Sequence, residues 1–438
     1  MRARPYPRYK DADIEWLEQV PAHWQAKPLK RLTAFSTGWT PPTGREEFYG
    51  GEHLWANISD LGPRVLTSTE KTITDAAVKE ARLRSVDVGS LLFSFKLSVG
   101  AVSIAGAPMF TNEAIAAFAP SQSVFTPYLY WAAPVFISHN AQENIYGAPL
   151  LSRERIANAR LLCLSIPEQQ TIADFLDRET AKIDALVEKK ERLVELLQEK
   201  RSALITHAVT KGLDPNVPMK DSGIERLGQI PAHWEVRRMK RLAGKIGSGK
   251  TPRGGAESYV AEGAMLIRSQ NVRTGALDLD DVVFIDEATD REMADTRVRE
   301  GDVLLNITGA SLGRCCVARL QGGDANVNQH VCIVRPRPRV SESSYLAYEV
   351  MSPVVQCQIF ETQMGISRDA VNFEQIGDLQ LATPPQDEQC AIAEALDRET
   401  GKITALTAKV QEAIERLKEY RTALISAAVT GKIDVRGL

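Results

Sequence analysis

The strongest constraint on the fold is that much of the chain is written twice. Residues 9–32 (YKDADIEWLEQVPAHWQAKPLKRL) recur at 219–242 as MKDSGIERLGQIPAHWEVRRMKRL, with 13 of 24 positions identical. Residues 168–186 recur at 388–406 around a shared LDRET, and 201–214 recur at 421–434. Such a long period excludes a solenoid of short repeats and predicts a two-fold duplication of one large unit. A chain of 438 residues also exceeds the roughly 250–300 residues at which single cores stop growing.

Each copy ends in a segment with the pattern of a long helix. The two segments run for about 40 residues without an internal proline, and each would span roughly 60 Å at about 1.5 Å per residue. Proline stands just before each segment (Pro167, Pro385) and glycine near each end (Gly212, Gly431). Charged residues fill the outer faces, which is typical of a coiled coil. The apolar residues at a/d-like spacing are Leu176, Ile183, Leu186, Leu193, Leu197 and Leu204, and then Leu396, Ile403, Leu406, Leu417 and Leu424.

The remaining stretches indicate globular domains of short strands and helices. Short apolar runs punctuated by Gly and Pro predict strands, and 75–84 and 343–360 are helix candidates. The mixture is typical of an α+β fold rather than of regular βαβ alternation. We therefore expect four successive parts, which are a globular domain at 1–166, a helical spacer at 167–212, a second globular domain at 213–386 and a second spacer at 387–438.

One eight-residue motif suggests a different kind of protein. Residues 244–251, GKIGSGKT, satisfy the phosphate-binding P-loop pattern. That motif needs a buried strand before the glycines and a helix that opens at Lys-Thr, but RRMKRLAG precedes it and TPRGGAES follows it. The duplicated half has STGWTPP at the same place, with Trp39 where Lys250 stands. Only G-x-T-P is kept, so we interpret the segment as the entry turn of the second globular domain.

Other catalytic patterns are missing from the sequence. There is no H-E-x-x-H or G-x-G-x-x-G, and the six cysteines show no C-x-x-C pair. We expect no metal and no cofactor in this chain. No apolar h-region opens the chain and no window resembles a membrane span, so we expect a cytoplasmic protein without a membrane partner.

Polar residues follow several of the apolar runs and have the chemistry of nucleic-acid binding. Asn, Gln and Arg can make bidentate contacts to base edges, while Ser, Thr, Lys and Arg suit phosphates. Net charge is only −3, but residues 219–260 carry nine Lys/Arg against four Asp/Glu. The candidates in the first half are Trp39, Arg45, Asn57, Ser59, Lys96, Ser98 and Asn112. The candidates in the second half are Lys250, Arg253, Arg268, Ser269, Gln270, Asn271, Arg273, Thr308, Ser311, Arg314, Asn328, Gln329 and Arg368.

Together these segments resemble the specificity subunit of type I restriction–modification systems. The resemblance rests on the two P-A-H-W entries, on FSFKLSVG with TNEAIAAF, on GDVLLNITGASLGRC with NVNQHVCIVRP, and on the paired EQ-x-x-IA-x-x-LDRET helices. It covers essentially the whole chain in the family's order.

The resemblance implies a subunit that binds double-stranded DNA and has no catalysis of its own. Two target-recognition domains would each read one half of a bipartite, asymmetric sequence, and two antiparallel helices would separate them as a spacer. Those helices would dock two methyltransferase subunits, which use S-adenosylmethionine and flip an adenine. Restriction subunits would supply ATP- and Mg-dependent translocation and cleavage.

Three alternatives remain open at this point. A coiled-coil adaptor that binds no DNA would explain the helices but not two large polar-loop domains. A P-loop protein would use Gly244–Thr251 to bind nucleotide. A specificity subunit that serves methylation alone has the same sequence features as one that also serves restriction.

Overall fold

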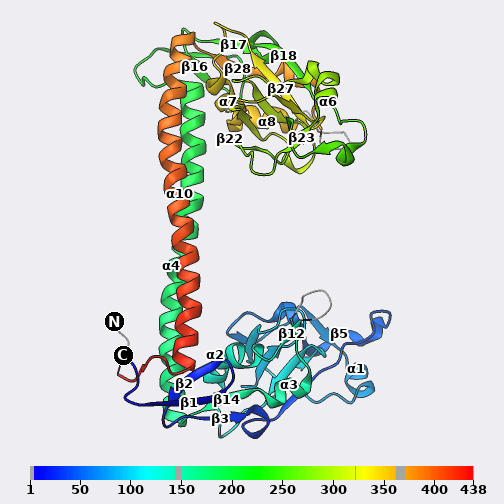
Figure 1. The fold of residues 1–438 in the computed structure, drawn as a ribbon, viewed down its shortest axis with the longest axis vertical. Helices are drawn as coiled ribbons and strands as arrows, with labels where there is room; N and C mark the ends of the chain where they lie inside the picture. The colour runs from blue at the N-terminus through cyan, green and yellow to red at the C-terminus, as the bar shows by residue number, and fades with distance from the viewer. Residues whose placement is uncertain (1–3, 144–148, 321, 362–369, 438) are drawn as a thin grey trace. The chain divides into compact units, whose positions relative to one another are not determined.

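The chain forms two compact units, each built around parts of the same two long helices (Figure 1). The computed structural model describes residues 4–143, 149–320, 322–361 and 370–437. The first unit comprises Met1–Lys190 with Glu412–Leu438, and the second comprises Glu191–Gln411. Helices α4 (Ile166–Lys211) and α10 (Gln386–Val429) each contribute one part to each unit.

The two helices run antiparallel within each unit. In the first unit, Leu176 near the start of α4 and Ala428 near the end of α10 belong to the same core cluster. Asp184, which is later in α4, pairs with Arg421, which is earlier in α10. Gly212 (φ +76°) and Gly431 (φ +75°) follow the two helices in the left-handed conformation that ends a helix. The proline and glycine signals in the sequence therefore marked both helices correctly.

The predicted seam of the coiled coil needs one correction. Leu176, Ile183, Leu197, Leu396 and Ile403 are buried as expected. The a/d assignment is wrong for Leu186, Leu193 and Leu406, which are 43%, 39% and 45% exposed. The buried positions follow 3–4 spacing through half-buried Val187 and Thr407, and this register leaves the three leucines one position outside the seam. Leu204, Leu417 and Leu424 are half-buried.

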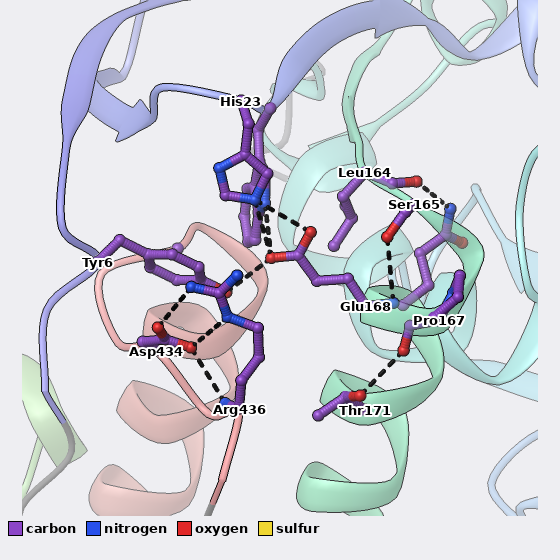
Figure 2. Close-up of polar contacts among 12 residues, drawn as sticks. Tyr6, His23, Leu164, Ser165, Pro167, Glu168, Thr171, Asp434 and Arg436 are labelled. Atoms are coloured by element: carbon purple, nitrogen blue, oxygen red, sulfur yellow. Dashed lines mark hydrogen bonds and ion pairs between the residues drawn. The ribbon is translucent and has the colours of Figure 1, made fainter.

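The P-A-H-W entry of the first copy is attached to the first turn of α4 (Figure 2). The indole Nε1 of Trp24 donates to Glu168 Oε1 at 3.1 Å, and His23 Nε2 lies 3.1 Å from both carboxylate oxygens of Glu168. The Tyr6 hydroxyl donates to the same carboxylate at 3.2 Å. Arg436, which pairs with Asp434, lies over the Tyr6 ring at 4.8 Å. Residues near both ends of the chain thus pack around the first turn of α4.

The second copy repeats this attachment on α10 with fewer partners. Trp234 Nε1 donates to Glu388 Oε2 at 3.0 Å, and His233 Nε2 lies 2.8 Å from the same oxygen. Both tryptophans are fully buried. The two histidines therefore belong to the scaffold, which is how the sequence was interpreted.

The globular part of the first unit contains a five-stranded sheet in the order β4-β11-β8-β9-β6 and a three-stranded sheet in the order β10-β5-β7. Its core gathers the strand residues Leu91 and Phe93 with Phe136 and Ile137 of the covering helix α2. The strands are β1 Tyr9–Ile14, β2 Leu17–Pro21, β3 Gln25–Pro28, β4 Phe35–Thr37, β5 Tyr49–Ala56, β6 Val65–Leu66, β7 Lys71–Ile73, β8 Leu91–Ser94, β9 Val102–Ala105, β10 Phe110–Thr111, β11 Ile115–Phe118, β12 Gln142–Glu143, β13 Pro149–Leu150 and β14 Arg160–Cys163. The helices are η1 Leu29–Arg31, η2 Glu46–Phe48, η3 Ile58–Asp60, α1 Asp75–Glu80, α2 Thr126–Ser138 and α3 Arg153–Asn158.

The globular part of the second unit is built on two four-stranded sheets, β18-β27-β24-β25 and β19-β23-β20-β26. The strands are β15 Met219–Asp221, β16 Gln229–Pro231, β17 Glu235–Arg238, β18 Ala243–Ser248, β19 Tyr259–Val260, β20 Ala264–Ile267, β21 Val272–Arg273, β22 Ala276–Leu277, β23 Val283–Ile285, β24 Val303–Asn306, β25 Cys315–Val317, β26 Ala325–Val327, β27 Val331–Pro336 and β28 Gln380–Thr383. The helices are α5 Met239–Leu242, η4 Gly255–Ser258, α6 Glu287–Glu292, η5 Ala294–Thr296, η6 Gly309–Ser311, α7 Ser343–Met351, α8 Pro353–Glu361 and α9 Phe373–Asp378.

Two predicted helices differ in extent from the observed ones. The candidate at 75–84 ends at Glu80, and the candidate at 343–360 is divided into α7 and α8. The division falls at Ser352, whose backbone is extended (ψ 144°), because Pro353 disfavours a helical residue before it. Among the helices of the described residues, none is long and apolar enough to cross a membrane.

Candidate nucleic-acid interface

The G-x-T-P turn occupies the same place in both units. A Cβ on Gly38 would lie 1.6 Å from the carbonyl oxygen of Thr111, and one on Gly249 would lie 1.5 Å from that of Val327. The Gly249 amide donates to the Asn328 carbonyl at 3.1 Å, and the Gly38 amide donates to that of Asn112 at 3.2 Å. Both turns thus need glycine because a neighbouring strand passes directly beside them.

The segment 244–251 lacks the helix that the nucleotide-binding alternative requires. A strand does precede Gly249, since Ala243–Ser248 forms β18, which the sequence analysis did not expect. However, no helix opens at Lys250 and Thr251. The next helical turn is the four-residue η4, which follows Gly254 in the left-handed conformation. The backbone amides that would hold a nucleotide phosphate are therefore not arranged at a helix start.

In the first unit, several polar loops meet at one edge of the sheet. Strand β11 pairs antiparallel with both β4 and β8, so the ends of β4 and β8 flank the start of β11. The Asn112 amide donates to the Ala56 carbonyl at 2.9 Å, so the end of β5 also lies at this edge of the sheet. We call the loops 38–40, 57–59, 95–98 and 112–114 the first loop edge.

In the second unit, the equivalent loops meet in the same way. Strand β27 pairs antiparallel with both β18 and β24, and the Asn328 amide donates to the Ile267 carbonyl at 3.1 Å. We call the loops 249–251, 268–270, 307–311 and 328–330 the second loop edge. The Asn306 amide group donates to the Ser269 carbonyl at 2.8 Å and ties the loop 268–270 to the end of β24.

The structure brings most of the predicted first-half residues to the first loop edge. Asn57 and Ser59 belong to a 3-10 turn in which the Asn57 side chain accepts from the Ser59 amide at 2.8 Å. Lys96 and Ser98 lie in the loop after β8, and the Asn112 side chain accepts from the Ala114 amide at 3.1 Å. Trp39 is half-buried.

Two aromatic and basic residues continue the first loop edge. The Trp39 ring lies 6.0 Å from that of Phe48, and the Arg45 guanidinium lies 4.1 Å from the centre of the same Phe48 ring. Arg45 also pairs with Glu47 at 2.7 Å. It lies on the neighbouring loop rather than on the edge itself.

Acidic side chains hold the basic residues of the second loop edge. Lys250 lies 2.9 Å from both carboxylate oxygens of Asp295, and its hydrogen bond lowers the pKa of Asp295. Arg268 and Gln270 both donate to Asp281. A DNA phosphate that binds here must therefore replace a protein carboxylate.

Hydroxyl and amide groups complete the second loop edge. Thr251 donates to Gln329 at 2.6 Å, and Thr308 lies 2.7 Å from His330 Nδ1. The Asn328 side chain accepts from the His330 amide at 3.1 Å. Ser311 is half-buried and its carbonyl accepts from the Arg314 amide at 3.2 Å.

The prediction for Asn271 is wrong. Its side chain is only 2% exposed, accepts from the Arg268 amide at 2.9 Å and donates to the carbonyls of Asp278 and Asp281. Asp60 fills the same role in the first unit by accepting from the Asn57 amide at 2.8 Å. Asp60 and Asn271 stand at the same place in the two copies. This correspondence was the signal in the sequence that Asn271 has a structural role.

Two of the remaining candidates lie beside the second loop edge, and one lies outside the described residues. Arg253 is exposed in the turn after Thr251, and Arg273 is exposed in the β21–β22 hairpin, where it pairs with Asp278 at 3.5 Å. Arg368 lies outside the described residues. Asp281 and Asp295 carry no signal in the sequence, because nothing in a single sequence marks an acid that neutralises a distant cation.

The described residues offer little nucleophilic or metal-binding chemistry. Burial raises the pKa of the Cys316 and Cys332 thiols to about 12 each, which keeps both thiols protonated. Among the residues with described positions, no group of three or more His, Cys, Asp or Glu side chains could hold a metal ion.

Comparison with known proteins shows which family the chain resembles. The family described as "Type I restriction modification DNA specificity domain" matches residues 231–416. The MjaIX specificity subunit of Methanocaldococcus jannaschii is 24% identical over 98% of this chain and 97% of its own length. Over almost its whole length the chain is similar to type I restriction–modification specificity subunits. The EcoBI specificity subunit of Escherichia coli is 22% identical over 70% of this chain and 66% of its own length.

Solved structures of the type I specificity subunits share the fold of this chain. A chain from a structure that describes the complex assembly and conformational transition of the type I restriction–modification system aligns with a TM-score of 0.66 at 16% identity, over 94% of this chain and 99% of its own. The HsdS subunit from Thermoanaerobacter tengcongensis aligns with a TM-score of 0.53 at 15% identity, over 94% and 98%. The α+β expectation is confirmed, and the specificity-subunit family is non-catalytic.

Proposed function

We propose that this chain is the DNA-sequence-recognition subunit of a type I restriction–modification complex. Each loop edge reads one half of a bipartite, asymmetric target in double-stranded DNA, and the chain acts in the cytoplasm. The helices α4 and α10 set the number of unread base pairs between the two halves.

One observation carries this proposal. The two loop edges share a backbone framework, as the matching bonds from Asn112 to Ala56 and from Asn328 to Ile267 indicate. The side chains on that framework differ, however, because Asn57 is replaced by Arg268 and Lys96 by Thr308 when the strands are superposed by their pairing. A common scaffold with unlike polar groups fits two readers of different sequences.

The chemistry of the loop edges suits a division between base and phosphate contacts. Arg268 and Gln270 can make bidentate contacts to guanine and adenine in the major groove. Lys250 and Lys96 are suited to phosphates, which fix the register on the duplex. The carboxylates of Asp281 and Asp295 compete with phosphates and so weaken binding away from the target.

Partner subunits supply the catalysis in this proposal. Two methyltransferase subunits bring S-adenosylmethionine, and restriction subunits bring ATP and Mg-dependent translocation and cleavage. The buried seam leucines are already used between α4 and α10, so docking falls to the outer helix faces. Leu186 and Leu406 occupy equivalent places in the two copies and are 43% and 45% exposed, which supports one docking contact on each copy.

Methylome mapping tests the proposal directly. Adenine methylation is mapped in a strain that has the partner subunits, with and without this gene. We expect the loss of one motif with two fixed ends and an unread middle. An unchanged methylome would overturn the proposal in favour of a scaffold that binds no DNA. Insertion of one heptad in α4 and one in α10 should lengthen the unread middle and leave both ends unchanged.

A further inference from the structure

The second unit contains a cavity of about 880 Å³ beside the long helices. Arg201 of α4, Asp397 and Thr404 of α10, and Tyr348 of α7 line one part of it, and Gly275 of the β21–β22 hairpin lines another. All of these residues belong to the second unit, and none lies on the second loop edge.

One nitrogen of the Arg201 side chain lacks an acceptor in this cavity. The Nε atom is buried and has no hydrogen-bond partner, and no carboxylate of the described residues forms an ion pair with Arg201. The guanidinium lies against the hairpin, since a Cβ on Gly275 would come within 2.7 Å of Arg201 Nη2. A buried Nε–H without an acceptor loses its hydration without compensation.

The first unit shows how the same helix position is neutralised there. Arg421 stands 220 residues after Arg201 and corresponds to it in the repeat. Its guanidinium pairs with Asp184 at 2.8 Å and 3.2 Å and lies 5.8 Å from the centre of the Trp131 ring. The residue that corresponds to Asp184 is Thr404, which cannot accept a charge-assisted pair.

A second ion pair of the first unit is also missing from the second. Arg64 donates to Asp177 at 2.8 Å and lies over the Tyr130 ring at 3.9 Å. Gly275 stands where Arg64 stands in the repeat. Asp397, which corresponds to Asp177, has a hydroxyl donor, Tyr348, at 2.7 Å, and no ion pair to it occurs among the residues with described positions. The cavity therefore lies where two residues of the first unit, Arg64 and Asp184, have no counterpart.

The lining decides between possible occupants. Asp280 and Asp397 also line the cavity, so several closely spaced DNA phosphates would meet these carboxylates, whereas a single carboxylate can pair with Arg201 alone. A single inorganic anion would leave most of the volume and the apolar lining by Leu277, Met351 and Ala405 uncovered. An acidic side chain that is carried on an apolar protein segment satisfies both the charge of Arg201 and the apolar wall.

We propose that this cavity anchors an acidic residue of one methyltransferase subunit through a charge-assisted hydrogen bond to Arg201. This inference rests on the proposed function. The first unit has no equivalent anchor, because Asp184 already occupies Arg421. The two methyltransferase subunits accordingly bind the duplicated chain with unequal affinity, and the subunit at the second unit binds more tightly.

Substitutions that fill or remove the anchor test this inference. The full chain is titrated with the purified methyltransferase subunit of its own system, and native mass spectrometry and calorimetry report the stoichiometry and both affinities. Arg201→Glu removes the cation. Thr404→Asp keeps Arg201 but supplies the acid that the first unit has. We expect each variant to weaken the tighter of two binding events at least tenfold and to leave the other unchanged.

Matched controls separate the anchor from a folding defect. Thr404→Asn keeps the shape of the aspartate without its charge and should bind as the wild type does. Restoration of tight binding to Arg201→Glu by an acid-to-arginine change in the methyltransferase subunit would support a direct pair. Two equal binding events in the wild type, or unchanged affinities in Arg201→Glu and Thr404→Asp, would overturn the anchor but not the proposed function. A wild-type chain that binds no methyltransferase subunit would overturn both.

Discussion

Gly249 lies so close to Val327 that no side chain fits between them. The position of a Cβ atom on Gly249 would be 1.5 Å from the Val327 carbonyl oxygen and 2.2 Å from its carbonyl carbon. Gly38 and Thr111 have the same relationship in the first unit, at 1.6 Å and 2.3 Å. The glycine of the apparent P-loop is therefore required for strand packing and not for a nucleotide.

Alanine substitutions within GKIGSGKT should distinguish these roles. Gly249→Ala must displace the backbone near Val327, and we expect destabilisation on the order of 3 kcal/mol. Gly247→Ala is the matched control, because its nearest neighbour is a flexible lysine carbon 4.0 Å away and alanine suits a strand better than glycine. Denaturant unfolding measures both. Equal stabilities of the two variants would contradict the packing explanation.

Removal of the helix-start carboxylates should affect the two copies unequally. Glu168 is 7% exposed and accepts from Trp24 and Tyr6, whereas Glu388 is 30% exposed and accepts from Trp234. Glu168→Ala leaves a buried indole N–H without an acceptor, so we expect a loss of about 1–3 kcal/mol. Water can replace more of the Glu388 contacts, and Glu388→Ala should cost less. Thermal unfolding compares them, with the exposed Glu191→Ala as the control.

Lys250→Ala should weaken DNA binding with little dependence on sequence. Loss of one phosphate contact should reduce the slope of log affinity against log salt by about 1. Asp295→Asn should have the opposite effect on affinity, because it frees Lys250 from its carboxylate. Fluorescence anisotropy of the assembled complex at several salt concentrations measures both. A change confined to one base pair of the target would instead identify Lys250 as a base contact.

Glu349 should make the stability of the second unit depend on pH. Burial raises the pKa of its carboxyl well above the ordinary value of 4.5, so the folded chain keeps a proton that the unfolded chain releases. The contribution to stability is full below about pH 4.5 and falls as pH rises toward the folded pKa. Glu349→Gln carries no such proton. We expect the variant to unfold at a higher temperature than the wild type, by a margin that grows as the pH rises above 4.5 in calorimetry.

Leucine substitutions on α4 should confirm the corrected register. Leu176 is fully buried, and Leu176→Ala should cost about 2–5 kcal/mol because it leaves a cavity. Leu186 is 43% exposed, and Leu186→Ala should change the stability of the isolated chain by no more than about 1 kcal/mol. Similar losses for the two variants in denaturant unfolding would show that Leu186 belongs to the seam after all.

Local signals in the sequence were enough for the scaffold. The two copies of P-A-H-W predicted a packed histidine beside tryptophan, and Pro167, Pro385, Gly212 and Gly431 marked both helices, because each of these residues acts on the backbone next to it. The position of the seam was harder to predict. Leu186 and Val187 are both apolar neighbours, and only the packing of α4 on α10 decides which of them is covered.

The sequence by itself determined that the chain is duplicated, that each copy ends in a long helix, and which loops carry polar groups. These properties are written in repeats, periodicity and composition. Only the tertiary structure decided that Asn271 is a buried cap, that Asp295 holds Lys250, and that Arg201 has lost the acid that Arg421 keeps. The physical reason is that hydrogen bonding and ion pairing depend on distance in space, and the residues concerned lie far apart in the chain.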